Sequence, residues 1–416
     1  MELKYYINQK GEIPDTALSL TGGGALERAS RFHKTIPGYA PTPLVSLDHL
    51  ARKLGVTQVL VKDESKRFGL NAFKALGGSY AMARCLGQRL GWPEEKLTFE
   101  ALMAPEVREK LGELTFVTAT DGNHGRGVAW AARQLGHKSV VYMPKGSAQE
   151  RLDNIRAQGA QAEITDLNYD DAVRLANRMG QEHGWILVQD TAWPGYEEIP
   201  AWIMEGYTTI AWELFQQLED LGGRMPTHLF LQAGVGSFAG AMLGSFAARM
   251  GKDCPITCIV EPDRADCLYR SARAADGQLH PVTGEMNSMM AGLCCGEPCT
   301  ISWEIIRPGA AAFLSCSDEY SAMGMRLLGR PEPGDPAVVS GESGAVGVGA
   351  LSAILHEEKL EDLRWSLGPV SYTHLDVYKR QTWSWPPPTA ASAGRCWPCC
   401  GRRSSPPRTP TGRETP

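Results

Sequence analysis

Short apolar segments alternate with helix-forming segments through most of the chain, and this alternation is the feature that most restricts the fold. Buried strands are predicted at residues 59–62, 115–120, 139–143, 186–190, 228–232, 257–260 and 312–315. Helices are predicted at residues 125–135, 148–158, 170–182 and 198–221. Such alternation favours parallel sheets with helices on both faces, so we expect an α/β fold.

Length and charge exclude several classes of protein. The 416 residues allow more than one domain, and the formal net charge of -5 gives no sign of a nucleic-acid surface. Residues 1–9 lack the apolar segment of a signal peptide, and the apolar run at 344–355 is too short to cross a bilayer. We therefore expect a cytoplasmic protein with no nucleic-acid or membrane partner.

The cysteines do not form a metal motif. They number 11 and are scattered, which in the cytoplasm predicts free thiols, many of them buried. The spacing of Cys294, Cys295 and Cys299 does not match a zinc ribbon, and no histidines lie beside them. We expect no metal site.

The composition changes near Val370. From residue 382 to residue 416 there is no Val, Ile, Leu, Met or Phe. Such a segment cannot form a core, so we expect residues 370–416 to be disordered. One interpretation is a natural tail. The other is an artefact of sequence assembly, because residues 370–381 back-translate into a DNA inverted repeat that looks like two abutting transposon ends.

Lys74 is the first candidate functional residue. It lies among apolar residues just before Gly77 and Gly78, at the expected start of a helix. Most lysines are simply solvated. Here, desolvation near a helix N-terminus would disfavour the ammonium form and leave a nucleophile for a carbonyl group. The two glycines would let the backbone approach a bound ring.

A glycine-rich turn at residues 234–240 links strand 228–232 to a helix. Open backbone N–H groups and a helix N-terminus suit a phosphate monoester. Tight turns and dinucleotide sites use similar sequences, but the dinucleotide pattern with its acidic ribose partner about twenty residues later is missing. The candidate phosphate-binding residues are Gly234, Val235, Gly236, Ser237, Phe238 and Gly240.

Further polar residues follow predicted strands, where sites gather in α/β sheets. Asp121, Asn123 and His124 follow strand 115–120, and Asp190 ends strand 186–190. Helix capping explains the residues after strand 115–120 about as well as a functional role does. Turn formation is the simpler explanation of Asp190, and capping explains Glu342 nearly as well as a cofactor contact does. In the functional interpretation, Asn123 binds a ring hydroxyl and Asp121 faces the reacting carbon. Together with Lys74, these turns indicate an enzyme that holds pyridoxal phosphate on a lysine.

The turns resemble the tryptophan-synthase-β type of pyridoxal-phosphate enzyme, also called fold type II, which includes threonine dehydratases. Threonine dehydratases have Ser-Phe-Lys-x-Arg-Gly and Ser-Gly-Asn-His. This chain has Ala-Phe-Lys-Ala-Leu-Gly around Lys74 and Asp-Gly-Asn-His from Asp121. At both places the sequence differs from the dehydratase pattern and matches that of the diaminopropionate ammonia-lyases. The chain resembles these enzymes over residues 31–355. It is strongest at residues 62–71, 143–151, 188–193, 261–267 and 340–347.

The resemblance implies an architecture. We expect two open, twisted, mostly parallel sheets flanked by helices, and a homodimer. Residues 1–80 and 196–369 would form a large cofactor-binding domain, and residues 81–195 a small domain. Cys267 and Cys295 match positions that can pair in the family.

The resemblance also implies roles for the candidate residues. Lys74 would carry the cofactor, Asn123 would hold its ring hydroxyl, the turn at 234–240 its phosphate, and Glu342 would also contact it. Asp121 and Asp190 would take the α-proton, one from each enantiomer of 2,3-diaminopropionate. The products would be pyruvate and two molecules of ammonia.

Two alternatives stay open. A related threonine or serine dehydratase is disfavoured by Asp121, because a serine holds that place in the dehydratase pattern. The other alternative is an inactive, truncated ammonia-lyase. The family has a Ser-Thr-Glu-Gly-type strand at the pyridine nitrogen, and the chain departs from the family pattern near Val370 without it.

Overall fold

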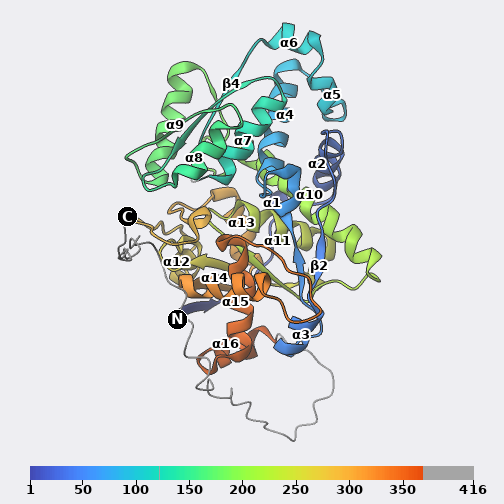
Figure 1. Ribbon diagram of the computed structural model, residues 1–416, viewed down its shortest axis with the longest axis vertical. Coiled ribbons are helices and arrows are strands. Elements are labelled where there is room, and N and C mark those ends of the chain that lie inside the picture. Colours follow the sequence, from blue (N-terminus) through green and yellow to red (C-terminus); the bar gives the residue numbers. More distant parts are fainter. Residues whose placement is uncertain (121, 369–416) are drawn as a thin grey trace, which may run out of the picture. The chain divides into compact units, whose positions relative to one another are not determined.

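Two sheets and a short antiparallel ribbon organise the chain (Figure 1). The computed structural model describes residues 1–120 and 122–368, which belong to one compact unit. One sheet has the order β1-β10-β9-β8, in which only β1 is antiparallel to its neighbour. The other has the order β6-β5-β4-β7 and is parallel throughout.

The strands of the first sheet are β1 (Leu3–Ile7), β8 (His228–Gln232), β9 (Ile256–Pro262) and β10 (Ala312–Cys316). Those of the second are β4 (Thr115–Ala119), β5 (Lys138–Met143), β6 (Gln161–Ile164) and β7 (Ile186–Leu187). The ribbon pairs β2 (Leu44–Ser46) with β3 (Leu60–Lys62).

Alternation of apolar side chains explains why helices cover both faces of the second sheet. Val140 of β5 packs with Ala172 of α9, whereas Val141 points to the other face and packs with Leu152 of α8. Figure 1 shows α7, α8 and α9 around β4. These helices are α7 (Asn123–Gln134), α8 (Gln149–Arg156) and α9 (Tyr169–His183).

The first sheet follows the same rule. Val260 of β9 packs with Val346 of α15, and its neighbour Ile259 belongs to the core that contains Ile306 of α13. Its helices are α11 (Ser237–Met250), α12 (Cys267–Ala274), α13 (Thr300–Gly309), α14 (Asp318–Gly329), α15 (Glu342–His356) and α16 (Glu361–Leu367).

Helices α4 and α10 cross at close range. A Cβ on Gly206 of α10 would lie 2.7 Å from the Leu76 carbonyl oxygen of α4, so glycine is needed at the crossing. The remaining helices are α1 (Asp15–Leu18), α2 (Gly24–Lys34), α3 (Asp48–Leu54), α4 (Ala75–Leu90), α5 (Phe99–Leu102), α6 (Pro105–Leu111) and α10 (Glu198–Asp220).

The expected α/β fold with mostly parallel sheets is confirmed, with differences in detail. The strand expected at 186–190 stops at Leu187, and Gln189 N–H donates to the Tyr196 hydroxyl at 2.9 Å instead of continuing the sheet. Strands β1, β2 and β6 were not predicted, and helix α4 crosses the expected domain boundary at residue 80.

Some expectations are not tested by the structure. The division into a large and a small domain stays a prediction, and the tail at 370–416 lies outside the described residues. Within residues 1–120 and 122–368, every helix is too short or too polar to cross a bilayer.

Candidate active site

Lys74 lies at the N-cap of α4, wedged between two other helices. A Cβ on Gly127 of α7 would lie 3.0 Å from the Lys74 carbonyl carbon. A Cβ on Gly77, one turn after Lys74, would lie 2.6 Å from Cε1 of Tyr207 in α10. These close approaches fix the backbone of Lys74, while 23% of its side chain stays exposed.

Asp190 is the partner of the Lys74 amine. Lys74 Nζ donates to Asp190 Oδ2 at 2.5 Å, and the Asp190 side chain is only 3% exposed. Residues 116 apart in the chain therefore meet at the end of β7, as expected for a residue that follows a parallel strand.

This contact corrects one expectation about Lys74. Burial by itself would lower the pKa of Lys74, as we predicted from the sequence. However, the charge of Asp190 and its hydrogen bond outweigh burial and raise the pKa of Lys74 well above its usual value. Burial likewise opposes ionisation of Asp190, but His124 and Lys74 outweigh it and lower the pKa of Asp190 to about 2. The pair is therefore an ammonium and a carboxylate.

The Asp190 carboxylate has a polar surrounding. The Tyr169 hydroxyl donates to Asp190 Oδ1 at 3.4 Å, and the Gln189 amide donates to the Tyr169 hydroxyl at 3.0 Å. The Ser237 hydroxyl donates to the Asp190 backbone carbonyl at 2.5 Å. Ser237 therefore ties the glycine-rich turn directly to the residue that binds Lys74.

His124 lies next to the same carboxylate. Its Nε2 is 2.8 Å from the Val188 carbonyl oxygen, which only accepts, so Nε2 carries the proton. Nδ1 is 3.8 Å from Asp190 Oδ2 and has no hydrogen-bond partner among the described residues. Burial lowers the pKa of His124, which favours the neutral ring near pH 7.

The turn before α7 is only partly described. Asp121 lies outside the described residues. Gly122 is the N-cap of α7, and Asn123 is its exposed first residue. His124 lies in the first turn as expected, and is buried in the site rather than solvated.

The turn at 234–240 leads into α11, whose N-cap Gly236 provides no side-chain cap. Gly236 has φ +103°, and a Cβ there would lie 2.9 Å from the Ser302 hydroxyl of α13. A Cβ on Gly240 would also lie 2.9 Å from Ser302. These glycines therefore let α13 pack closely, and the N–H groups of the first turn of α11 are left without partners inside the helix. Phe238 packs on Phe73, next to Lys74, with ring centroids 4.5 Å apart.

The candidate residue Glu342 is connected to the turn before α7. Glu342 begins α15 and accepts a hydrogen bond from Arg151 at 2.8 Å. Arg151 also lies over the Asn123 turn, because a Cβ on Gly122 would be 3.1 Å from its Cδ. Arg151 thus connects α15 to the start of α7.

Both cysteines singled out from the sequence lie at Gly234. The Cys267 sulfur is 3.8 Å from the Gly234 carbonyl oxygen, and the Cys295 sulfur is 3.3 Å from where a Gly234 Cβ would be. Burial raises the pKa of the Cys267 thiol well above its usual range.

The sequence did not single out Tyr169, Gln189 or Tyr207, although all three lie near the Lys74–Asp190 pair. Tyr169 begins α9 and Tyr207 is in the middle of α10, without any turn motif around them. No local signal marks such residues, because the tertiary contacts alone bring them to Lys74.

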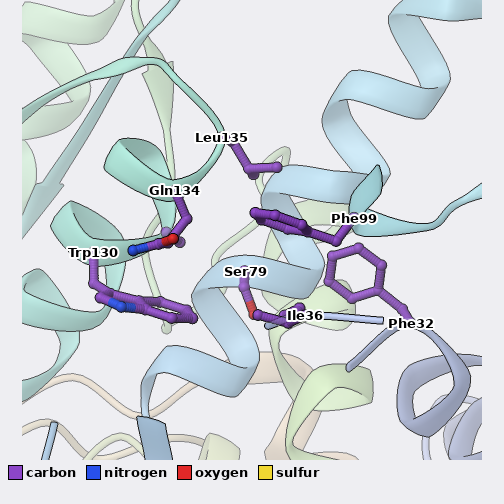
Figure 2. Close-up of a pocket in the computed structure, with 8 residues that line it drawn as sticks. Phe32, Ile36, Ser79, Phe99, Trp130, Gln134 and Leu135 are labelled. Carbon is purple, nitrogen blue, oxygen red and sulfur yellow. The ribbon is translucent and has the colours of Figure 1, made fainter. Parts of the chain in front are cut away.

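A separate apolar pocket is shown in Figure 2. Phe32, Phe99, Trp130 and Leu135 line it, with Ser79 and Gln134 as its polar residues. It contains no ionisable side chain and none of the candidate residues, so it belongs to the packing of α2, α4 and α7. In the described part of the chain, no three His, Cys, Asp or Glu residues are grouped as a metal site.

Known proteins resemble this chain over most of its length. The family model described as "Pyridoxal-phosphate dependent enzyme" matches residues 35–364. The diaminopropionate ammonia-lyase of Salmonella typhimurium is 54% identical over 396 residues, which cover 92% of this chain and 98% of that protein. The Escherichia coli K12 enzyme of the same name is 53% identical over 336 residues, covering 80% and 82% of the two chains.

A solved structure agrees. The crystal structure of the Escherichia coli diaminopropionate ammonia-lyase in complex with D-serine has a TM-score of 0.81 and 48% identity, with 88% of this chain and 90% of that chain covered. The match, the lysine at a helix start and the glycine-rich turn before α11 agree with one another. The chain belongs to the pyridoxal-phosphate-dependent enzymes of fold type II and, among them, to the diaminopropionate ammonia-lyases.

Proposed function

We propose that this protein catalyses α,β-elimination of 2,3-diaminopropionate, from both the D and the L enantiomer. Diaminopropionate and one water give pyruvate and two molecules of ammonia, which balances all atoms. The identity of the substrate rests on the relatives, which are named for this activity. The Lys74–Asp190 contact of 2.5 Å is the observation of this structure that carries the proposal, because it places an amine beside a candidate proton acceptor.

The residues present fit pyridoxal phosphate. The N-terminus of α11 has no side-chain cap, so its N–H groups and its positive dipole end are available for a phosphate. Lys74 supplies the amine for the cofactor aldehyde, Asn123 the polar group for the ring hydroxyl, and Glu342 a further cofactor contact. When bound, the cofactor supplies an electron sink for the carbanion formed at the substrate α-carbon.

Asp190 is the proposed proton acceptor for one enantiomer. Its pKa is low while the Lys74 ammonium is beside it. Once the Lys74 nitrogen is engaged elsewhere, burial raises the proton affinity of the carboxylate, which makes it a better base.

Asp121 is the proposed acceptor for the other enantiomer. A carboxylate there would also attract the substrate β-ammonium. The complex of the Escherichia coli relative with D-serine supports access of a D-amino acid to this type of site.

Activity on each enantiomer tests this proposal. We expect the 416-residue chain to release pyruvate from D- and L-diaminopropionate faster than from serine or threonine. Asp121→Asn and Asp190→Asn should each lose mainly one enantiomer, with a fall of at least about 100-fold. Higher activity on threonine would favour a dehydratase. If the chain bound the cofactor but released no pyruvate from any of these compounds, the inactive ammonia-lyase would be the better interpretation.

We also propose that the protein is a cytoplasmic homodimer, as the family resemblance implies. Light scattering after size-exclusion chromatography tests the dimer, since a monomer would have half the expected mass.

A further inference from the structure

Asp190 favours one of the two protonation states of Lys74. Asp190 is ionised and accepts hydrogen bonds, but it has no proton to donate. It therefore stabilises the Lys74 ammonium, which has no lone pair and cannot attack a carbonyl carbon. The neutral amine can still donate to Asp190, but its lone pair needs a hydrogen-bond donor, and the ionised Asp190 is not one.

Tyr207 is such a donor. It is 1% exposed, and its hydroxyl has no hydrogen-bond partner among residues 1–120 and 122–368. A Cβ on Gly77 would lie 2.9 Å from Tyr207 Cζ, the carbon that bears the hydroxyl, and Gly77 is one turn after Lys74. The ring of Phe73 meets the Tyr207 ring edge-on at 5.1 Å. Tyr207 is thus fixed against the turn that carries Lys74.

The Tyr207 hydroxyl keeps its proton. Burial raises its pKa, and although the Lys74 charge opposes this effect, Asp190 adds to it. A neutral, buried O–H group without an acceptor is uncommon in folded proteins.

The other titratable groups near Lys74 do not replace this donor. The His124 proton is on Nε2 and is used by the Val188 carbonyl, so Nδ1 offers only a lone pair. Cys295 lies at Gly234, and a thiol is a weak donor.

We propose that Tyr207 is a positioning residue whose hydroxyl donates a hydrogen bond to the lone pair of the neutral Lys74 amine and so stabilises the amine relative to the ammonium. This hydrogen bond breaks when the lone pair attacks a carbonyl carbon. The flexible lysine side chain would move its nitrogen between Asp190, as the ammonium, and Tyr207, as the amine. This inference rests on the proposed role of Lys74 as the residue that carries the cofactor.

The test is the pH dependence of cofactor attachment in Tyr207→Phe, which removes only the hydroxyl. The full chain is stripped of cofactor, mixed with pyridoxal phosphate at a series of pH values and quenched with borohydride at short times. Mass spectrometry then measures the cofactor fixed on Lys74. We expect the midpoint of the rate profile to rise by about 0.7 pH unit, which is about fivefold in rate below the midpoint.

Tyr80→Phe is the matched control, because Tyr80 is a buried tyrosine of α4 whose hydroxyl instead binds Glu205 at 2.9 Å. Its profile should coincide with that of the unmodified chain. If the rate profile of Tyr207→Phe also coincided with that of the unmodified chain, the inference would be overturned.

If the Tyr207→Phe protein does not fold, a second substitution at the same position provides the test. With 3-fluorotyrosine at position 207 the donor is stronger, so the midpoint should fall, and an unchanged midpoint would refute the inference. Failure of the proposed function is distinguishable, because the unmodified chain would then fix no cofactor on Lys74 at any pH.

Discussion

Lys74 and Lys62 are both lysines paired with a buried carboxylate, yet their surroundings differ. Lys62 Nζ donates to Glu213 at 2.7 Å, to the Thr42 carbonyl at 2.8 Å and to Gln217 at 2.9 Å. Lys74 Nζ has one hydrogen-bond partner in the described part of the chain, Asp190. The Lys62 amine is saturated, whereas the Lys74 amine can exchange its partner.

The direction of the pKa shift by itself would select the wrong lysine. Burial lowers the pKa of Lys62, and the attraction of Glu213 does not fully compensate. The pKa of Lys74 is raised. A lysine with a lowered pKa is the better nucleophile in principle. The difference teaches that the functional amine is identified by its hydrogen bonds rather than by its pKa. Lys74 has room for a second hydrogen-bond partner and lies beside a site that can receive a cofactor.

Lys74→Ala should have the largest effect on chemistry. We expect no borohydride-reducible yellow product and a fall of at least about 1000-fold in pyruvate release, because no other amine occupies that position. Lys62→Met should keep the reducible product, although the protein is less stable. Loss of the product in Lys62→Met, with the fold intact by circular dichroism, would break the comparison.

Glu213→Gln should cause the largest loss of stability. Glu213 binds both Lys62 and Arg67, with Arg67 Nη1 at 2.7 Å, and is itself fully buried. Removing the carboxylate leaves the buried Lys62 ammonium without its ion-pair partner and Arg67 with Glu64 as its remaining carboxylate partner, which we expect to cost about 3 to 5 kcal/mol in the free energy of unfolding.

Urea denaturation measures this loss. Glu219→Gln, on the exposed side of the same helix, is the control and should change the free energy of unfolding by less than about 0.5 kcal/mol. Equal losses for the two variants would mean that the buried network is not stabilising.

Asp190 should make the protein sensitive to acid. Its pKa is depressed from 3.8 to about 2 in the folded state, so its stabilisation is present above the unfolded value and is lost as the pH falls through the folded one. We expect a contribution of about 2 kcal/mol, lost between about pH 4 and pH 2. In Asp190→Asn this part of the loss should disappear, and an unchanged acid profile would argue against the Lys74–Asp190 pair.

Lys53→Met should have the smallest effect of the series. Lys53 Nζ lies 2.5 Å from Glu332, as close as Lys74 is to Asp190, but the two side chains are 44% and 32% exposed. Solvent screens this pair, so the free energy of unfolding should change by less than about 1 kcal/mol. A larger change in thermal or urea denaturation would show that distance, rather than burial, sets the strength of these pairs.

Much of the fold could be predicted, because local patterns encode it. Strand β8 was predicted with its observed bounds, since its apolar run is flanked by turns on both sides. Strand β6 was missed because its side chains alternate between exposed and half-buried and give little hydrophobic signal. The strand ending at Asp190 was predicted too long because the sequence does not show that Tyr196 takes the N–H group of Gln189.

The candidate site likewise contains residues that could be predicted from the sequence and residues that could not. Lys74, Asp190 and the turn at 234–240 were found because turns after strands have recognisable residues. Tyr207 and Tyr169 were missed because they lie in regular helices, where nothing local distinguishes a residue that faces a site from one that faces the core. The charge state of Lys74 was wrongly predicted for a related reason, since its partner is 116 residues away.

The sequence by itself determined the α/β fold, the family, the cofactor and the lysine that we propose carries it. The fold follows from local periodicity, the cofactor and its lysine follow from turn motifs, and the family follows from the resemblance of the sequence to known enzymes. Only the tertiary structure decided that Lys74 is held as an ammonium by Asp190. It also decided that Tyr207 lies against Gly77, one turn after Lys74, with a hydroxyl that has no hydrogen-bond partner in the described part of the chain. Protonation and hydrogen bonding depend on burial and on charges a few ångströms away, and folding brings those groups together from distant parts of the chain.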